Sequence, residues 1–210
     1  MIDAAGDRLS ASMIFTCFMV MVGPVKIILP FHRLTKGIDE AAARRLALRA
    51  FAFACLGGAV AAVGGVRTLD AWNIAPAALH FAAGLVLLLV ALRATVAQYE
   101  SAAHSDAPVV LPANLALMPI AFPIILTPYG IAALILLLVT SGEIGRTTTI
   151  IALFLAVMAI NLVAMWFVRP IVRHGGVALM LLGAVLAVLQ VGLATHMIAN
   201  ALHDLRVLYG

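Results

Sequence analysis

Long apolar stretches alternate with short polar links along the chain, and this pattern predicts six membrane-spanning helices. Each stretch approaches or exceeds the roughly 20 residues that a helix needs to cross the hydrocarbon core of a bilayer. The polar links hold nearly all of the charged residues. We therefore expect an all-α, polytopic membrane protein in which residues 1–210 form a single membrane domain. The apolar stretches run over residues 10–31, 46–66, 75–96, 113–140, 148–168 and 177–201.

Composition supports the same class of protein. The chain is 65% hydrophobic and 10% charged, whereas soluble domains carry about 25% charged residues. Cys17 and Cys55 lie in apolar stretches, where we interpret them as small buried hydrophobes and not as a disulfide or metal ligands. The first apolar stretch lacks a basic leader and a clear cleavage site, so we interpret it as a span and not as a signal peptide. No pattern predicts an enzyme site, a metal, a cofactor or a nucleic-acid partner.

Two of the predicted spans contain helix breakers. The first span holds Gly23, Pro24 and Pro30, and the fourth holds three prolines and a glycine between residues 119 and 130. An interior proline removes a backbone hydrogen bond and clashes with the preceding turn. In lipid, the carbonyls freed by such a break need partners from other helices or from a wet cavity. We therefore predict that helices one and four are broken, as in transporters that bind substrate near the bilayer midplane.

The two breaks suggest an internal repeat. Spans three and six add a second correspondence, because Gly84 and Gly183 each precede a run of leucine, valine and alanine. With three spans in each half, residues 10–97 and 113–203 would insert in opposite orientations and form an inverted repeat. The alternative is that apolar helices resemble one another by composition alone.

At these residues the chain resembles the MarC family, six-helix bacterial inner-membrane proteins grouped with the LysE-type amino-acid exporters. The first matching stretch is Gly23-Pro-Val-Lys-Ile-Ile-Leu-Pro-Phe31, followed by Leu34-Thr35. The second is Pro119-Ile-Ala-Phe-Pro123-Ile-Ile-Leu-Thr-Pro128-Tyr129. The resemblance implies a transporter-like fold with an inverted repeat. It also implies that small neutral amino acids, which some members carry, are candidate substrates.

The chain departs from the family pattern within both motifs. Gly23 stands where the family has Asn or Asp, and Lys26 replaces a glycine. Thr127 and Tyr129 replace the two glycines around Pro128. These positions would line the pocket in the family fold. The resemblance therefore predicts the fold more firmly than it predicts the substrate.

Lys26 is the strongest single candidate for a substrate-binding residue. A lysine near the bilayer centre costs about 2.5–3.5 kcal/mol, and such residues usually face a cavity or a partner. No aspartate or glutamate lies within a predicted span, so Lys26 has no obvious counter-ion. We hypothesise that it receives an anionic group of the substrate. The alternative is that its side chain reaches the cytoplasmic interface.

Other residues complete the candidate site. Helix N-termini beyond a break favour a carboxylate, and the freed carbonyls favour an ammonium. Thr127 and Tyr129 would add hydroxyl groups, or would only cap and pack the broken helix. For the remaining polar residues, structural hydrogen bonding between helices is the alternative to a relay. The substrate-binding candidates are Gly23, Pro24, Lys26, Thr127, Pro128, Tyr129 and Gly130, and the candidates for a proton or polar relay are His80, His196 and Asn161.

The function that we expect is secondary transport of a small metabolite, with a small neutral amino acid and export favoured by the resemblance. The alternative is a structural or regulatory membrane protein that transports nothing. Basic residues predominate in the links after spans one, three and five, which predicts that these links are cytoplasmic and both termini periplasmic in a bacterial inner membrane. The lipid bilayer and a small-molecule substrate are the expected partners, and the many small residues permit a homo-oligomer. Those basic residues are Arg33, Lys36, Arg44, Arg45, Arg49, Arg93, Arg169 and Arg173.

Overall fold

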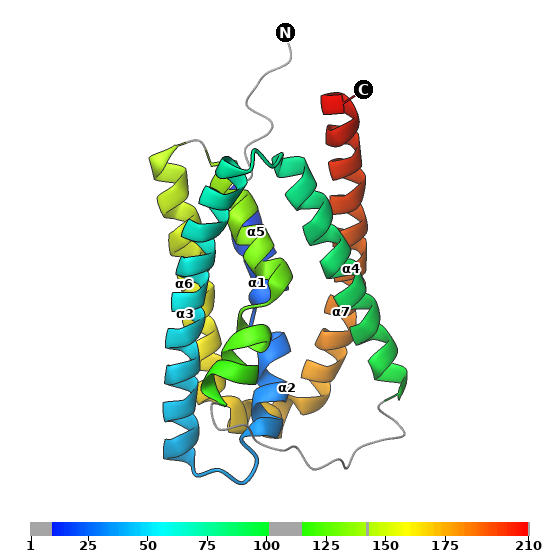
Figure 1. The fold of residues 1–210 in the computed structure, drawn as a ribbon. Coiled ribbons are helices and arrows are strands. Elements are labelled where there is room, and N and C mark those ends of the chain that lie inside the picture. Colours follow the sequence, from blue (N-terminus) through cyan, green and yellow to red (C-terminus); the bar gives the residue numbers. More distant parts are fainter. Residues whose placement is uncertain (1–9, 101–114, 142, 210) are drawn as a thin grey trace.

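The structure, a computed structural model, describes residues 10–100, 115–141 and 143–209 (Figure 1). Within these ranges the chain forms helices and no strand. Most of the link expected between the spans at 75–96 and 113–140 lies outside the described residues. The helices are α1 (Ala11–Val22), α2 (Val25–Leu34), α3 (Glu40–Ala71), α4 (Pro76–Glu100), η1 (Ala116–Ile125), α5 (Pro128–Val139), α6 (Ile144–Trp166) and α7 (Val168–Tyr209).

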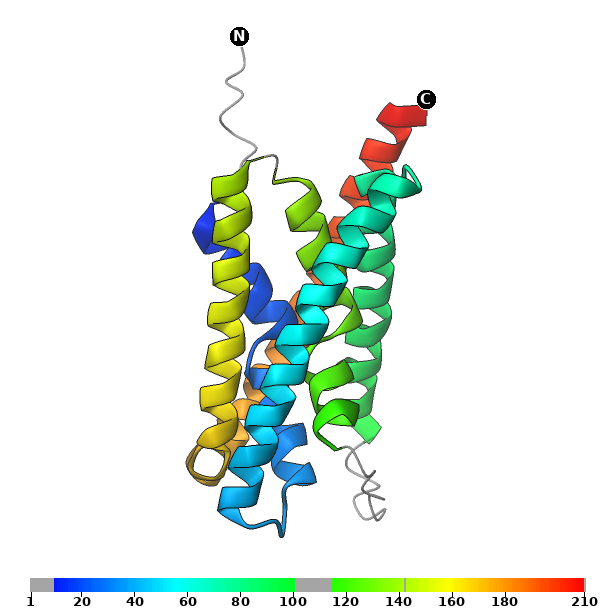
Figure 2. The same ribbon diagram turned by 60° about the vertical axis from the view of Figure 1, so that its left-hand side comes forward.

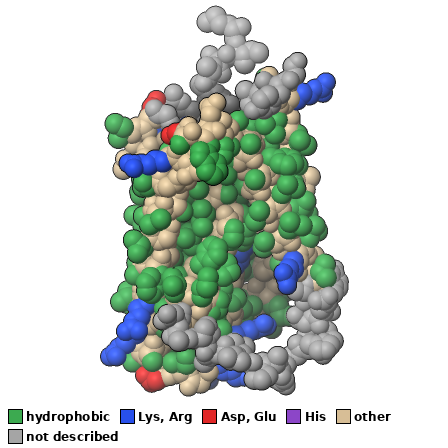
Figure 3. Space-filling model, in the orientation of Figure 1, with side chains coloured by type: hydrophobic (Ala, Val, Ile, Leu, Met, Phe, Trp, Pro, Cys, Tyr) green, Lys and Arg blue, Asp and Glu red, His purple; other side chains and the backbone are tan. Residues whose placement is uncertain are grey.

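The described helices provide five or six candidate membrane spans. Five are long and apolar enough alone, and α1 with α2 counts as one of these. The pair of η1 and α5 adds a sixth if the two are taken as one bent span. Hydrophobic side chains cover most of the visible surface, and most lysines and arginines lie toward its two ends (Figure 3). The prediction of an all-helical, multi-pass membrane protein is therefore confirmed.

Two helices extend beyond the predicted spans. Helix α3 has 32 residues and continues through most of the predicted link at 67–73, and α7 has 42 residues and begins at Val168. The predicted loop at 169–176 is therefore helical, which corrects that boundary. Its one proline, Pro170, lies in the first turn of α7, where proline costs no helical hydrogen bond.

The helices form a bundle with α1, α2, η1 and α5 at its centre (Figures 1 and 2). Helix α4 runs along α7 on one side, and α3 and α6 lie side by side on the other. The larger apolar core includes Phe18 of α1 and Phe154 of α6, whose rings meet edge to face with centroids 5.6 Å apart. This geometry suits the quadrupoles of the two rings.

Two central helix pairs are interrupted near the middle of the bundle. Gly23 and Pro24 separate α1 from α2, and Leu126 and Thr127 separate η1 from α5. Helices η1 and α5 meet at an angle of 60°. The α1–α2 pair and the η1–α5 pair run in opposite directions between the ends of the bundle (Figure 1).

Helix η1 is irregular because of its prolines. Met118 and Phe122 have extended backbone angles, with φ of −128° and −134°, and each precedes a proline. The ring of a proline disfavours helical angles in the residue before it. The stretch from residue 119 to 130 is therefore not a smooth helix, as its composition predicted.

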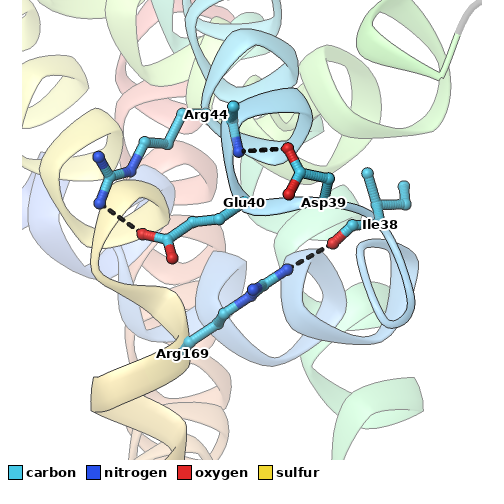
Figure 4. A network of polar contacts seen from close by, with 6 residues as sticks. Ile38, Asp39, Glu40, Arg44 and Arg169 are labelled. Carbon is cyan, nitrogen blue, oxygen red and sulfur yellow. Dashed lines mark hydrogen bonds and ion pairs between the residues drawn. The ribbon is translucent and has the colours of Figure 1, made fainter.

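Polar contacts fix the start of α3 at one end of the bundle (Figure 4). Asp39 caps α3 by accepting a hydrogen bond from the backbone of Ala41. Glu40 and Arg44 form an exposed ion pair one turn apart. The guanidinium of Arg169 donates to the carbonyl of Ile38 and so links the first turn of α7 to the α2–α3 link.

Candidate functional site

In the described structure, polar side chains from several elements meet at the C-terminal end of α1. The last carbonyls of a helix have no partner within it. Here three consecutive carbonyls, those of Val20, Met21 and Val22, accept hydrogen bonds from side chains of other elements. We call this region, with the adjoining first turns of α2 and α5, the junction.

Lys26 and Tyr129 join the two breaks across the junction. Lys26 Nζ donates to the Tyr129 hydroxyl at 2.6 Å and to the Met21 carbonyl at 3.2 Å. The same nitrogen lies 4.6 Å from the centroid of the Tyr129 ring. Tyr129 is buried, whereas Lys26 is half-buried. The sequence placed both residues at breaks, and the structure brings them into direct contact.

Thr127 and Gly130 hold α5 against the end of α1. Thr127 is the N-cap of α5, and its hydroxyl oxygen accepts from the backbone N–H of Gly130 at 3.1 Å. The same hydroxyl donates to the Met21 carbonyl at 3.3 Å. A Cβ at position 130 would lie 2.4 Å from Cγ1 of Val22, so only glycine permits this approach.

Gly23 is required for the turn from α1 into α2. A Cβ at this position would lie 2.0 Å from the backbone oxygen of Met19. No side-chain movement relieves a clash with a backbone atom, so any larger residue would shift the break itself. Pro24 follows at the N-cap of α2, where its missing N–H costs nothing.

Asn161 and Gln190 supply the remaining partners of the α1 carbonyls. Asn161 of α6 donates through Nδ2 to the Val22 carbonyl at 2.7 Å, and Gln190 of α7 donates through Nε2 to the Val20 carbonyl at 2.7 Å. Both contacts are interhelical, and for Asn161 this is the structural alternative to a relay that the sequence left open. Asn161 is 0% exposed, yet its Oδ1 has no hydrogen-bond partner among the described residues.

Lys26, when protonated, brings a positive charge to the junction that no acidic side chain in the described ranges offsets. Among the described residues, no aspartate or glutamate lies within ion-pair distance of Lys26. The carbonyl end of α1 supplies partial negative charge beside Nζ. The first turns of α2 and α5 supply partial positive charge. The arrangement therefore favours an added anion over an added cation.

The histidines lie away from these hydrogen bonds. His80 on α4 and His196 on α7 are close enough to interact electrostatically with each other. His196 is exposed, and its Nε2 lies 3.0 Å from the Asn200 amide nitrogen. Among the described residues, no hydrogen bond connects either histidine to Lys26 or Thr127. Pro128 is also apart from the buried contacts, because it is exposed.

The junction is closed in this conformation. Val22, Thr127 and Tyr129 are 1%, 6% and 3% exposed, so their own side chains fill the space between the breaks. One pocket in the described part of the chain lies elsewhere, at the turn between α3 and α4. It is lined by Leu69, Asp70, Asn73, Ile74, Ala75, Pro76 and Val139.

Sequence reasoning missed the role of the Met21 backbone. Its carbonyl accepts from both Lys26 and Thr127, and a carbonyl carries no side-chain signal in the sequence. The available signal was indirect: a Gly-Pro break must free the carbonyls that precede it, and polar residues in other spans are the partners that can reach them.

The described helices provide five or six apolar segments long enough to span a bilayer, packed into a bundle around a small polar junction. These are the features of a polytopic helical membrane protein. The model of the MarC family, described as integral membrane proteins, matches residues 10–205. The chain belongs to the MarC family. No curated protein and no solved structure matches it.

Proposed function

We propose that the protein is a secondary transporter that binds a small metabolite at the junction and moves it by alternating access. One observation carries the proposal. Lys26 brings an ammonium group to the meeting point of two interrupted helices, where no carboxylate from the part of the chain that the structure describes pairs with it. A charge inside a membrane protein is costly and usually serves a substrate or an ion.

The arrangement of the central helices supports the transport mechanism. We propose that residues 10–97 and 113–203 are inverted repeats, with α1–α2 and η1–α5 as their broken first helices. The two pairs run in opposite directions (Figure 1), and the hydrogen bond from Thr127 to the Met21 carbonyl supports a shared position of the two breaks. Rocking of one half against the other would then open the junction to either side in turn.

We propose that the substrate carries a carboxylate that Lys26 receives. Thr127 and Tyr129 position this ammonium and the α1 carbonyls, while Gly23 and Gly130 permit the close approach of the two breaks. A small neutral amino acid is the substrate that membership of this family favours, and export is the favoured direction. The closed junction corresponds to a state in which neither side has access.

We also propose that the protein lies in a bacterial inner membrane with both termini in the periplasm. The α2–α3 link, which includes Lys36, lies at the same end of the bundle as Arg169, which contacts Ile38 in that link (Figure 4). The excess of basic residues in the links at this end predicts that it faces the cytoplasm.

The proposal is tested by counterflow in proteoliposomes preloaded with glycine, alanine, glycolate or lactate. We expect at least one of these compounds to exchange at least tenfold faster than in protein-free liposomes. Lys26→Met, which keeps much of the side-chain volume without the charge, should reduce that exchange at least tenfold. Lys36→Met is the matched control because Lys36 is exposed in the α2–α3 link, and its exchange should match the parent protein.

A second candidate function is a structural or regulatory membrane protein that transports nothing. The observation that favours it is the closed junction, in which each of the last α1 carbonyls from Val20 to Val22 already has a partner. In that case Lys26 would serve only as a cap for α1. Absence of exchange for all four compounds by correctly folded protein, with Lys26→Met lowering only the melting temperature, would favour this candidate.

A further inference from the structure

Lys26 Nζ lies in the surroundings that an alkylammonium ligand would require. Its neighbours are a carbonyl at the negative end of a helix, a phenol oxygen and an aromatic ring. Carbonyl oxygens and hydroxyls accept from ammonium groups, and aromatic faces attract them. The α-amino group of an amino acid would need the same neighbours.

These neighbours already form hydrogen bonds with side chains of the protein. A carbonyl oxygen has two lone pairs, and the Met21 carbonyl uses both, for Lys26 Nζ and for the Thr127 hydroxyl. The Tyr129 oxygen lies 2.6 Å from Nζ. A second ammonium would find the Met21 carbonyl already occupied and would be repelled by the first. Repulsion between like charges is strong in a site that excludes water.

The same ammonium retains one donor for a ligand. A lysine ammonium carries three N–H bonds, and two of them serve Met21 and Tyr129. With no aspartate or glutamate nearby among the described residues, the missing partner for the third is an anion. A carboxylate supplies both the acceptor and the counter-charge.

From these contacts we propose that the junction selects a small carboxylate that has no amino group, because Lys26 itself occupies the ammonium position. The inference rests on the proposed transport function, keeps the carboxylate that Lys26 receives, and replaces the amino acid that family membership favours with a carboxylate that lacks the amino group. It sets the protein apart from a carrier of zwitterions, in which both charges of the ligand must be received.

Asn161 provides a second observation that points to a ligand. Its Oδ1 is a buried acceptor without a partner, next to the bond that its Nδ2 makes with the Val22 carbonyl. A buried acceptor left unpaired destabilises the protein, and a ligand that donates to it removes that cost. The hydroxyl of a hydroxy acid can donate to such an acceptor without bringing a second positive charge near Lys26. The favoured class is therefore a small hydroxy monocarboxylate.

The test compares ligands that differ only in the exchange of an amino group for a hydroxyl. Glycolate is matched with glycine, and lactate with alanine, as ligands of the purified wild-type protein in titration calorimetry and in counterflow. We expect each hydroxy acid to bind at least tenfold more tightly than its amino-acid partner and to exchange faster. This comparison needs no variant, so a failure of a variant to fold leaves the test intact.

Variants then assign the selectivity to Lys26. Lys26→Met should weaken glycolate binding at least tenfold, and Lys26→Gly, which vacates the ammonium position, should raise the ratio of glycine to glycolate affinity at least tenfold. Tyr129→Phe keeps the ring and removes the hydroxyl, so the preference for glycolate should persist with weaker binding. Lys36→Met should leave both affinities unchanged.

The possible failures are distinguishable. If wild-type protein binds and exchanges glycine or alanine as well as the matched hydroxy acid, the inference is overturned and the transport function stands. If Lys26→Gly leaves the ratio unchanged, the assignment to Lys26 is overturned. If folded protein neither binds nor exchanges any of the four compounds, the inference and the proposed function fail together.

Discussion

The amide of Asn161 lies 2.7 Å from the carbonyl oxygen of Val22, 139 positions earlier in the chain. This contact fastens the middle of α6 to the end of α1. Asn161 is fully buried, and Val22 is 1% exposed, so water cannot replace the bond. In an apolar interior, loss of the donor would leave the carbonyl unpaired.

We therefore expect Asn161→Leu to destabilise the protein by about 1–3 kcal/mol, the cost of leaving a buried acceptor without its donor. The expected result is a lower melting temperature in detergent, measured by tryptophan fluorescence or by loss of the monodisperse peak after heating. Asn200→Leu is the matched control because Asn200 is exposed on α7. Equal melting temperatures for the two variants would show that the contact with Val22 contributes nothing.

The close contact between α5 and α1 predicts that a substitution on one helix can be rescued by a substitution on the other. Gly130→Ala would place a Cβ 2.4 Å from Val22 Cγ1 and 2.8 Å from Thr127 Oγ1, so we expect it to destabilise the protein by about 1–3 kcal/mol. Val22→Ala removes the nearer atom. In a double-mutant cycle, the two substitutions together should cost less than the sum of their separate costs. Additive costs would contradict the close contact.

Gly23→Ala should behave differently. Its Cβ would lie 2.0 Å from the backbone oxygen of Met19, which truncation of the Met19 side chain does not move. We expect Gly23→Ala to lower the yield of folded protein and Met19→Ala to give no rescue. The comparison with Gly130→Ala thus separates a backbone clash from a side-chain clash. Rescue by Met19→Ala would show that the break is arranged differently.

The sequence predicted the class of fold because lipid imposes a simple pattern. Apolar stretches of span length, with charges confined to the links, allow few structures other than a helical bundle. Boundaries were less predictable, since α3 and α7 extend past the spans on polar residues that are compatible with helix and lie beyond the apolar stretch. The prolines marked where smooth helices could not form, but not the angle between η1 and α5.

The candidate site was only partly predictable. Lys26 stood out as a charge within a span, and Thr127 and Tyr129 as departures from the family motif. Nothing in the sequence showed that Lys26 and Tyr129, 103 positions apart, would share a hydrogen bond. The three α1 carbonyls escaped notice because a backbone group acquires a role only through the tertiary arrangement.

Gly84 and Gly183 look equivalent in the sequence but differ in their surroundings. A Cβ at position 84 would lie 2.9 Å from Ile198 Cγ1 and 3.2 Å from the Ala194 carbonyl oxygen, whereas nothing lies within 4 Å of a Cβ at position 183. We expect Gly84→Ala to lower the melting temperature by loosening α4 from α7. Gly183→Ala should raise it, because alanine favours helix over glycine by about 0.5–1 kcal/mol. Equal effects would argue against the close approach of α4 and α7.

Cysteine labelling tests the proposed orientation in the membrane. In a background with Cys17→Ala and Cys55→Ala, a single cysteine is introduced by Lys36→Cys or by Asp70→Cys, both at exposed positions. Position 36 lies in the α2–α3 link before the start of α3, and position 70 lies in the last turn of α3, so the two are at opposite ends of the bundle (Figure 1). A membrane-impermeant maleimide added to spheroplasts should label the cysteine at 70 and should label the one at 36 only after lysis.

The reasoning behind this expectation is electrostatic. The links at the Lys36 end carry most of the basic residues, and such links stay in the cytoplasm during insertion. Labelling of position 36 and protection of position 70 in intact spheroplasts would reverse the orientation. The bundle would remain the same, but the direction of transport assigned to each side of the junction would change. Labelling of both positions in each preparation would instead point to a mixed orientation, as expected if the difference in charge between the two ends is too small to fix one.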